Sequence, residues 1–395
     1  MVVFSTGTAA ASVLTARTAV LATFFVNGFA FATWASRIPA VRDALGLGPA
    51  QLGLLLLAVS VGSLTALPTT GGAVQRFGAR RVVMAAVAVE GVGLLLLGFG
   101  AGVVETVPVT AAALFLVGVG NGGWDVAMNV EGAEVERLLG RSVMPRFHAA
   151  FSLGTVAGAG LGALVIFAGV GVAGHVGIVA VLVAGLGMLT AQRFLPVAAA
   201  RAEPRKGSSL RAWREPRTLA VGVMVLAMAL TEGVANDWLG VAIMDGYGAP
   251  AWVGAAGFAL FVASMTVGRV FGTVLLDRFG RLQVLWGTMA VAAAGVLLVV
   301  LGQHPVLVAV GILLWGLGAS LGFPVGMSAA SDDPVKAPAR VSVVATIGYT
   351  AFLGGPPLVG FLGAHFGVLQ ALLIVSVVLL PAAFAVPAAR KPAAG

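Results

Sequence analysis

Three polar side chains lie on one face of a long apolar stretch. Asn121, Asp125 and Asn129 are four residues apart, so on a helix they form one polar stripe. The stretch covers about residues 108–138 and is long enough to cross a bilayer. A charge near the membrane centre costs roughly 2.5–3.5 kcal/mol on insertion scales, so Asp125 must face a cavity or a partner. Because such a carboxyl can exchange protons as a cavity opens to either side, we predict that Asp125 binds and releases protons.

A second stretch, residues 217–243, also carries acids inside apolar sequence. Glu232 is just past its midpoint, Asn236 follows one helical turn later, and Asp237 is nearer the outer end. One interpretation is that Glu232 faces a cavity, where it titrates or binds hydroxyl groups. The other is that Glu232 is a structural partner for an arginine or for the backbone of a broken helix.

Amides and tryptophans elsewhere could complete a solute site, since ring faces stack on sugar C–H surfaces while amides bind hydroxyls. Asn27 and Trp34 share one helical face of the first apolar stretch, where Trp34 could equally be an interfacial anchor. For the other tryptophans the alternative is packing or lipid contact. The predicted substrate-binding residues are Asn27, Trp34, Asn121, Trp124, Asn129, Asn236, Trp238 and Trp315.

The remaining charges in or near apolar stretches are interpreted mainly as structural. We expect Arg37 and Asp43 to form an outer salt bridge, with a substrate role for Arg37 as the alternative. For Glu90 we expect pairing with a neighbour and not a role in transport. We interpret Glu131, Glu134 and Glu136 as mostly solvated charges at a helix end and as partners in a charge network.

The composition explains why these residues lie in membrane helices. The chain has 395 residues, 59% of them hydrophobic and 10% charged, with a mean hydropathy of +1.04. This is more apolar surface than a soluble core could hide, so the sequence predicts an all-α polytopic membrane protein. A cleavable signal peptide is not expected, because residues 1–16 lack its pattern.

Several chemistries are not expected. There are no cysteines and only 4 scattered histidines, so no metal or cofactor site is predicted. The sequence has no P-loop, serine triad or metal-ligand cluster, which argues against an ATP-driven pump or an enzyme.

Twelve spans are predicted, and basic residues orient them. Of the 23 Lys and Arg, 20 fall on one side, whereas Arg37 and Arg42 fall on the other and Arg269 lies inside a span. This asymmetry places both termini in the cytoplasm and the chain in a plasma (inner) membrane, and it explains the net charge of +8 without nucleic acid. The spans are residues 17–38, 50–74, 81–101, 107–138, 145–169, 174–195, 217–243, 250–276, 282–302, 305–330, 338–364 and 367–388.

The two halves of the chain repeat each other. Residues 75–80, containing Arg76, Gly78 and Arg80, recur as residues 277–282, and further matches keep offsets near 200. We therefore predict an N-terminal six-helix bundle at 1–195 and a C-terminal one at 217–395. A basic cytoplasmic linker at 196–216, in contact with anionic lipid, joins them.

The repeated turn resembles the Gly-x-x-x-Asp-Arg-x-Gly-Arg hallmark of the major facilitator superfamily. The first copy departs from it at Gln75, where the family usually has aspartate. The resemblance implies two bundles that rock about a midplane site, and a turn in which Asp277 latches one side against an arginine such as Arg340. The implied gating residues are Arg76, Gly78, Arg80, Asp277, Arg278, Gly280, Arg281 and Arg340.

A narrower resemblance comes from residues 124–129 and 147–154. They are similar to the fucose/proton symporter branch, which implies that Asp125 is the proton-linked acid and Asn129 its companion amide. Glu232 with Trp238 resembles a pair in related members. Glycines at 154, 158, 160 and 162 are similar to the motif of drug exporters, but Ala159 replaces its proline and helix packing alone explains them.

The sequence thus predicts a monomeric secondary transporter that carries a small polar, sugar-like solute together with protons through Asp125 and Glu232. Proton-coupled efflux of drugs or metabolites is the alternative within transport. A non-transporting sensor or scaffold is the alternative outside it, and buried acids argue against that.

Overall fold

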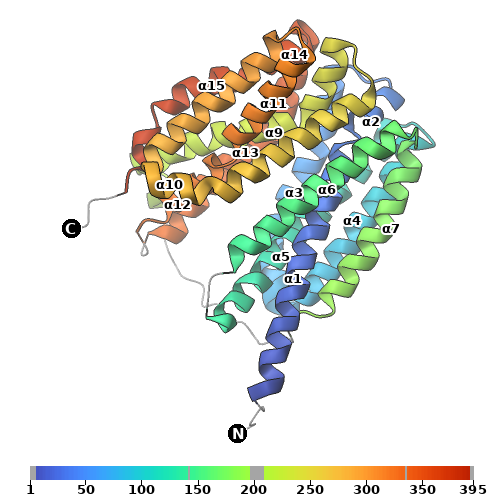
Figure 1. Cartoon of the computed structure of the whole chain (residues 1–395). Coiled ribbons are helices and arrows are strands. Elements are labelled where there is room, and N and C mark those ends of the chain that lie inside the picture. The colour runs from blue at the N-terminus through green and yellow to red at the C-terminus, as the bar shows by residue number, and fades with distance from the viewer. Residues whose placement is uncertain (1–5, 141–142, 196–208, 334–335, 392–395) are drawn as a thin grey trace. The chain divides into compact units, whose positions relative to one another are not determined.

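The computed structural model describes residues 6–140, 143–195, 209–333 and 336–391, and contains helices but no strand within those ranges (Figure 1). Contacts divide the chain into two compact units. Unit 1 is Met1–Leu47 with Leu55–Glu203, and unit 2 is Gly48–Leu54 with Pro204–Gly395. Most of the predicted linker, residues 196–208, lies outside the described residues.

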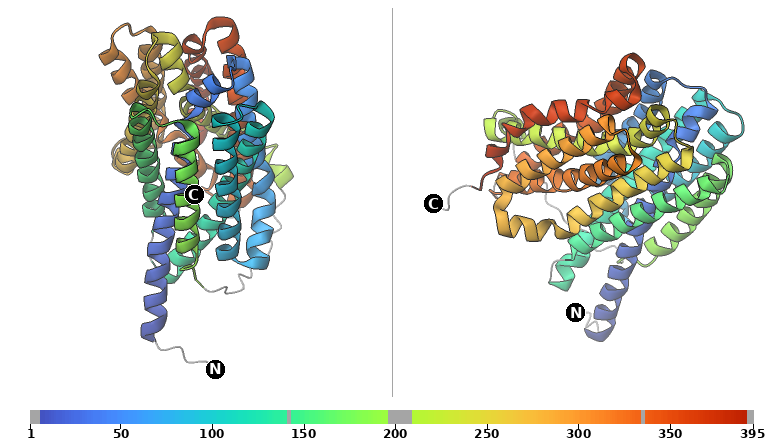
Figure 2. Two further views of the ribbon diagram at one scale, coloured as in Figure 1. Left: turned by 90° about the vertical axis from the view of Figure 1, so that its right-hand side faces the viewer. Right: turned by 45° about the horizontal axis from the view of Figure 1, so that its top comes forward.

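Unit 1 runs from blue to green in Figure 1, and its long helices lie alongside one another in both views of Figure 2. Its helices are α1 (Thr6–Ala35), α2 (Ile38–Ala44), α3 (Pro49–Phe77), α4 (Ala79–Gly102), α5 (Val107–Leu139), α6 (Met144–Phe167) and α7 (Val172–Ala191). The first turn of α3 belongs to unit 2 by its contacts.

Unit 2 runs from yellow to red in Figure 1. Its helices are α8 (Ser209–Ala212), α9 (Pro216–Tyr247), α10 (Ala251–Leu301), α11 (Pro305–Ala319), α12 (Gly322–Ala330), α13 (Ala337–Phe366), α14 (Val368–Ala371), α15 (Ile374–Ala383) and the 3-10 helix η1 (Val386–Ala389).

The predicted all-α membrane fold is confirmed. In the described residues, 10 helices are long and apolar enough to cross a membrane, and Val368–Ala383 is a shorter apolar one. The 51-residue α10 kinks at Gly280 and so covers two predicted spans. The predicted span 305–330 is broken at Ser320 and Leu321 into α11 and α12.

Glycine and proline set the helix ends. Proline occupies the first turn of α5, α6, α9 and α11, where its missing N–H costs nothing. Gly140 and Gly248 end α5 and α9 with φ of 63° and 61°, a left-handed conformation that favours glycine.

Glycines also let α1 and α6 pack backbone to backbone. A Cβ at Gly154 would lie 2.0 Å from the Phe25 carbonyl oxygen, and one at Gly28 would lie 2.2 Å from that of Phe151. A Cβ at Gly158 would lie 2.5 Å from the Phe29 carbonyl oxygen. These contacts support the packing interpretation for Gly154 and Gly158, whereas nothing lies within 4 Å of a Cβ at Gly160.

The sequence repeat corresponds to a repeat in packing. A Cβ at Gly118 would meet the backbone of Val59 at 2.1 Å, and its counterpart Gly316 would meet Phe261 at 2.5 Å. The turns after α3 and within α10 match as well, with Gly78 at φ 84° and Gly280 at φ 77°. Glycine is needed at both turns because other residues rarely adopt these angles.

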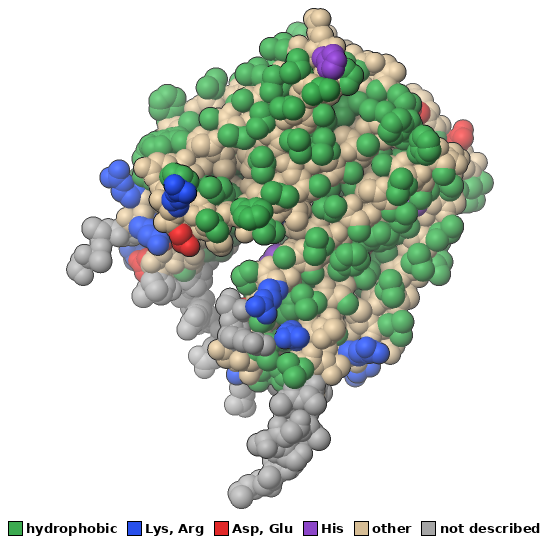
Figure 3. Space-filling view, viewed as in Figure 1, with side chains coloured by type: hydrophobic (Ala, Val, Ile, Leu, Met, Phe, Trp, Pro, Cys, Tyr) green, Lys and Arg blue, Asp and Glu red, His purple; other side chains and the backbone are tan. Residues whose placement is uncertain are grey.

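The helix flanks are apolar on the outside, as expected for contact with lipid. Leu164, Phe167 and Leu380 are 67%, 69% and 70% exposed. On the face drawn in Figure 3, hydrophobic side chains spread over the helices, whereas Lys and Arg lie at helix ends.

The α1–α6 contact generates a prediction about stability. Gly154→Ala places a methyl group against the Phe25 carbonyl, so we expect it to lower the unfolding free energy by about 1–3 kcal/mol. Gly160→Ala on the same helix is the control, because nothing lies within 4 Å of a Cβ there. Thermal unfolding in detergent measures both, and equal midpoints for the two variants would contradict the packing role.

Candidate functional site

The polar stripe of α5 is partly exposed on a helix whose neighbouring positions are buried. Asn121, Asp125 and Asn129 are half-buried, whereas Trp124 and Met128 are fully buried. The Asn129 Nδ2 donates to the Asp125 carbonyl oxygen at 2.8 Å and to its Oδ1 at 3.2 Å. Within the described ranges no cation pairs with the Asp125 carboxyl; its partner is an amide.

A second acid lies behind the stripe. Glu90 of α4 is 1% exposed, and its carboxyl lies near the Asn121 side chain of α5. Its Oε2 is buried without a partner in the described chain. The expectation that Glu90 pairs with a neighbour therefore stays a prediction.

In unit 2, the acid on α9 is paired with a cation. Arg269 of α10 donates through Nη2 to both carboxyl oxygens of Glu232, at 3.1 and 3.0 Å. Its Nε also donates to the Ser320 carbonyl oxygen at 3.4 Å, at the break between α11 and α12. This geometry matches the structural alternative for Glu232. Arg269 had been noted only as an arginine inside a span.

The two polar side chains that follow Glu232 on α9 have fewer hydrogen-bond or ion-pair partners than Glu232. Asn236 and Asp237 are both half-buried, and the Asn236 Oδ1 is buried without a partner in the described residues. Asn27 of α1 is 1% exposed, and its Nδ2 likewise lacks a described partner. These atoms keep unused hydrogen-bonding capacity inside the helices.

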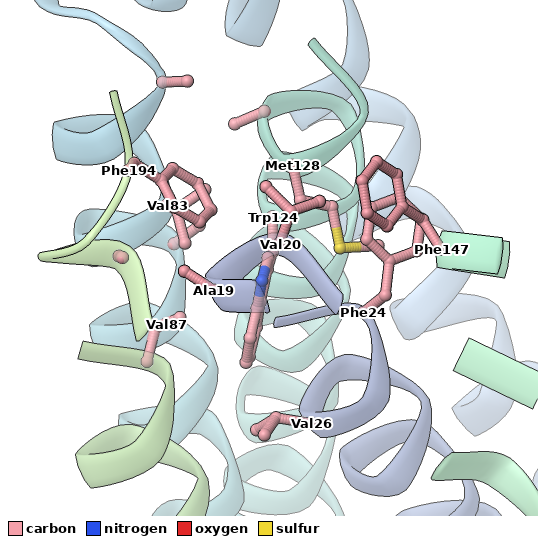
Figure 4. Packing of buried hydrophobic residues seen from close by; sticks show 14 of the residues in the cluster. Ala19, Val20, Phe24, Val26, Val83, Val87, Trp124, Met128, Phe147 and Phe194 are labelled. Atoms are coloured by element: carbon pink, nitrogen blue, oxygen red, sulfur yellow. The ribbon is translucent and has the colours of Figure 1, made fainter. Parts of the chain in front are cut away.

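The predicted tryptophans are packed into the two cores. Trp124 is 0% exposed and lies among Val20, Val87 and Met128, as Figure 4 shows. Trp315 donates Nε1–H to the Thr231 carbonyl oxygen at 3.0 Å. Trp34 and Trp238 are also buried, with 4% and 0% exposed. No ring face is open for stacking in this structure, so solute contact by these residues stays a prediction.

The predicted salt bridge between Arg37 and Asp43 is wrong. Asp43 pairs with the adjacent Arg42 at 2.8 Å. Arg37 follows the end of α1 and is buried, where it donates Nε–H to His175 Nδ1 at 2.8 Å and Nη2–H to the Val170 carbonyl oxygen at 2.9 Å. The helix end turns Arg37 inward, away from Asp43.

The predicted pair between Asp277 and Arg340 is not formed either. Arg340 pairs with Glu215 through a 2.6 Å contact, and Asp277 is exposed. The half-buried acid near this turn is Asp332, which accepts from Arg281 at 3.0 Å and from Arg217 at 2.8 Å. The gating role of the motif stays a prediction, but Asp332 is the acid that holds Arg281.

The other motif residues are on the surface of the turns. Arg76 and Arg278 each lie 5.3 Å from the centre of the next ring, Phe77 and Phe279, in the same arrangement in both repeats. Arg80 is exposed.

The acids at the end of α5 accept local hydrogen bonds, and Glu131 is buried where a mostly solvated charge was expected. Glu136 accepts from the backbone N–H groups of Val143 and Met144, which begin α6, at 2.6 and 2.7 Å. Glu131 accepts from the Leu195 N–H at 2.7 Å. Among the described side chains, no group of three or more His, Asp or Glu could hold a metal ion.

Asp332 generates a prediction about pH. Burial raises the pKa of Asp332, but hydrogen bonds from Arg281 and Arg217 outweigh it and hold this pKa below its usual range. The stabilisation is therefore present at neutral pH and lost as the pH falls below about 3.9 through the lower folded value. We expect Asp332→Asn to cost about 1 kcal/mol at pH 7, after allowance for solvent screening, and to weaken the loss of stability on acidification. Thermal unfolding from neutral to acidic pH tests this, with Asp277→Asn as the exposed control; identical pH profiles for Asp332→Asn and the parent would contradict it.

The Glu232–Arg269 pair generates a prediction about charge compensation. Arg269→Met leaves a half-buried carboxyl without its cation, so we expect a loss of about 2 kcal/mol in unfolding free energy. Adding Glu232→Gln removes that charge and should recover most of the loss. Arg137→Met is the control, since Arg137 is exposed and pairs with Glu134 on the same helix. A double variant no more stable than Arg269→Met would show that compensation is not the pair's role.

Comparisons with known proteins agree with this architecture. An uncharacterized MFS-type transporter of Yersinia pestis is 33% identical over 358 residues, 86% of each chain. The crystal structure of the nucleoside transporter NupG has a TM-score of 0.76 at 13% identity and covers 95% of this chain and 99% of its own. That of the E. coli fucose:proton symporter FucP has a TM-score of 0.62 at 15% identity, with 96% and 100% covered. The family model described as Major Facilitator Superfamily matches residues 20–346. The chain belongs to the major facilitator superfamily, the family of secondary transporters that its sequence motifs resemble.

Proposed function

We propose that this transporter carries a small polar, sugar-like solute together with protons, and that Asp125 is the proton carrier. The observation that supports this most directly is the different compensation of its intramembrane acids. Arg269 neutralises Glu232, whereas Asp125 has only the Asn129 amide in the described chain. An ionised carboxyl within the membrane is costly when no cation compensates it. Such a carboxyl is therefore best accommodated with a bound proton.

Proton coupling follows from this arrangement if the solute and the proton favour the same conformations. When Asp125 is protonated, the protein can change conformation without a buried charge. When Asp125 is ionised, the cost of desolvating the carboxylate opposes that change. Conformations that open to either side then exchange both solute and proton, which is symport by alternating access. Glu232 needs no proton for neutrality, so in this proposal it supports the broken α11–α12 region through Arg269.

We infer a hydroxyl-bearing solute from the side chains of the site and from proteins with the same fold. The stripe offers amide and carboxyl groups, which suit hydroxyl-bearing solutes. Two proteins of the same fold are a nucleoside transporter and a fucose:proton symporter by name, and both kinds of solute carry hydroxyl groups. Gly154 and Gly158 of α6 pack against α1, so these exporter-like glycines give the efflux alternative no support.

We also propose that the chain acts as a monomer in the plasma (inner) membrane with both termini in the cytoplasm. The proposal is supported by the distribution of Lys and Arg, of which 20 lie on one predicted side. The partners are then the solute, protons and lipid, and no nucleic acid.

The proton role generates a prediction for reconstituted protein. Asp125→Asn is a fixed neutral mimic, so we expect solute counterflow to stay near the parent rate while accumulation driven by a pH gradient falls at least tenfold. Glu232→Gln should lower the affinity for the solute or the unfolding free energy more than it lowers accumulation driven by the pH gradient. Glu134 is a half-buried α5 acid paired with Arg137, so Glu134→Gln is the control and should change neither counterflow nor accumulation.

Proteoliposomes with an imposed pH gradient measure both quantities, once a solute has been found by thermal shift. Full accumulation by Asp125→Asn would falsify the proton role. If the parent instead accumulated solute inside the vesicles while protons flowed out, the result would indicate proton–solute antiport, as in efflux.

A further inference from the structure

We propose that the last turn of the chain is a clasp that holds one end of unit 2 together, so that this unit moves as one body during transport. The C-terminal clasp consists of Arg217, Arg281, Asp332 and the backbone carbonyl groups of residues 388–390. These parts come from α9, α10, the end of α12 and η1, which contact one another in unit 2 (Figure 1). The proposal concerns the conformational cycle and holds for any solute or ion that the transporter carries.

Two arginines bind three consecutive carbonyl groups at the end of η1. Arg217, at the start of α9, donates Nε–H to the Ala388 oxygen at 3.0 Å and Nη2–H to the Arg390 oxygen at 3.1 Å. Arg281, just after the α10 kink, donates Nη1–H to the Ala389 oxygen at 3.0 Å. The last carbonyl groups of a helix lack partners within the helix, and cations close to them are stabilising. Charge-assisted hydrogen bonds therefore hold the end of the chain.

The same arginines bind the end of α12. The Asp332 carboxyl, two residues after α12, accepts from Nη2 of Arg217 at 2.8 Å and from Nη1 of Arg281 at 3.0 Å. Arg217 also donates to the Ala329 carbonyl oxygen at 3.5 Å. Arg281 donates to the Ser328 Oγ at 3.2 Å. One acid thus lies between two cations whose other donors hold the chain end, and the four elements meet in one hydrogen-bonded network.

Apolar contacts also fix η1 in unit 2. Val386 and Ala389 are both 0% exposed. Just before η1, the Ala383 carbonyl oxygen accepts Nε1–H from Trp286 of α10 at 2.9 Å. The last turn is therefore an integral part of unit 2, and its removal would leave the two arginines without three of their acceptors.

Unit 1 fastens the end of its last helix at the equivalent place by a different chemistry. Gly118 and Gly316 hold equivalent positions in the two repeats. The same offset in sequence relates Glu131 of α5 to Ala329 of α12. Glu131 accepts the N–H of Leu195, which follows α7, at 2.7 Å. Each unit thus ties the segment after its last helix to the same part of the repeat, through an acid in unit 1 and through an arginine in unit 2.

The position of the clasp indicates its task. Arg281 directly follows Gly280, the residue at which α10 kinks with φ of 77°. Glycine restrains its own backbone little, so the bonds of Arg281 to Asp332 and to the Ala389 carbonyl fix this kink. Bundles of this fold rock as bodies about a central site. With the clasp open, motion of one helix no longer moves the others. We therefore expect the solute to bind as before and the conformational change to be slower.

The first test uses the absence of cysteine from the chain. In Ala329→Cys the new thiol replaces a side chain that is 0% exposed, so its reaction with a water-soluble maleimide reports opening at the clasp. Deletion of residues 386–395 should raise the labelling rate about tenfold, whereas deletion of residues 392–395 alone should not. Ala242→Cys, equally buried in a later part of α9, is the control. No rise for Ala329→Cys, or an equal rise for both cysteines, would overturn the proposal.

The second test keeps the end of the chain and removes its partners. Arg217→Gln and Arg281→Gln should slow solute counterflow about fivefold while the affinity for the solute stays within about twofold of the parent. Arg193→Gln, at an exposed arginine after α7, is the control and should change neither quantity. Counterflow at the parent rate in both clasp variants, with both folded by thermal unfolding, would contradict the clasp. A loss of affinity as large as the loss of counterflow would instead assign the arginines to solute binding. Counterflow needs no gradient, so this test is independent of proton coupling.

Discussion

The structure depends on how a carboxyl is kept inside an apolar helix bundle. Three of the intramembrane acids meet this constraint differently, and Asp237 is a further half-buried acid on α9. Glu232 has an arginine from the neighbouring helix, whose Nη2 donates to both carboxyl oxygens. Asp125 has an amide one turn away, and the Glu90 Oε2 has no partner in the described chain. A charge compensated by Arg269 can remain through a conformational cycle, whereas an acid with only an amide partner is best accommodated with a proton. The proposed division between a structural acid and a proton carrier follows from this difference.

The scaffold that holds these acids is built on close backbone contacts. Gly28 and Gly154 let α1 and α6 touch, and Gly118 and Gly120 let α5 lie against α3 and α4. Because such contacts leave no room for a methyl group, helix rotation is set within narrow limits, and with it the direction of the polar stripe. Unit 2 repeats the α5 contacts at Gly316 and Gly318 with alanine in place of Glu90 and Asn121. Duplication therefore preserved the packing positions while function changed the side chains next to them.

The fold was predictable because hydropathy, loop charge and repeated glycines are local signals. Asp125 and Asn129 were found together for the same reason, since residues four apart on one helix are neighbours. Pairs between helices were harder, because they depend on helix rotation. Arg269 was visible as an arginine in a span, yet its partner could not be named, and Arg340 was paired with the wrong acid. The Arg37–Asp43 bridge failed because the end of α1 directs Arg37 toward His175. Burial of Trp124 and Trp315 likewise depends on which face each helix presents to its own core.

The central claim is that Asp125 is the acid whose proton changes during transport. Infrared difference spectroscopy of the protein in liposomes measures this directly, through the part of the carboxylic-acid C=O band that responds to pH or to added solute. The account predicts that this part of the band disappears in Asp125→Asn and persists in Glu232→Gln. A band that persists in Asp125→Asn and disappears in Glu232→Gln would contradict it and assign the proton to the acid that Arg269 holds.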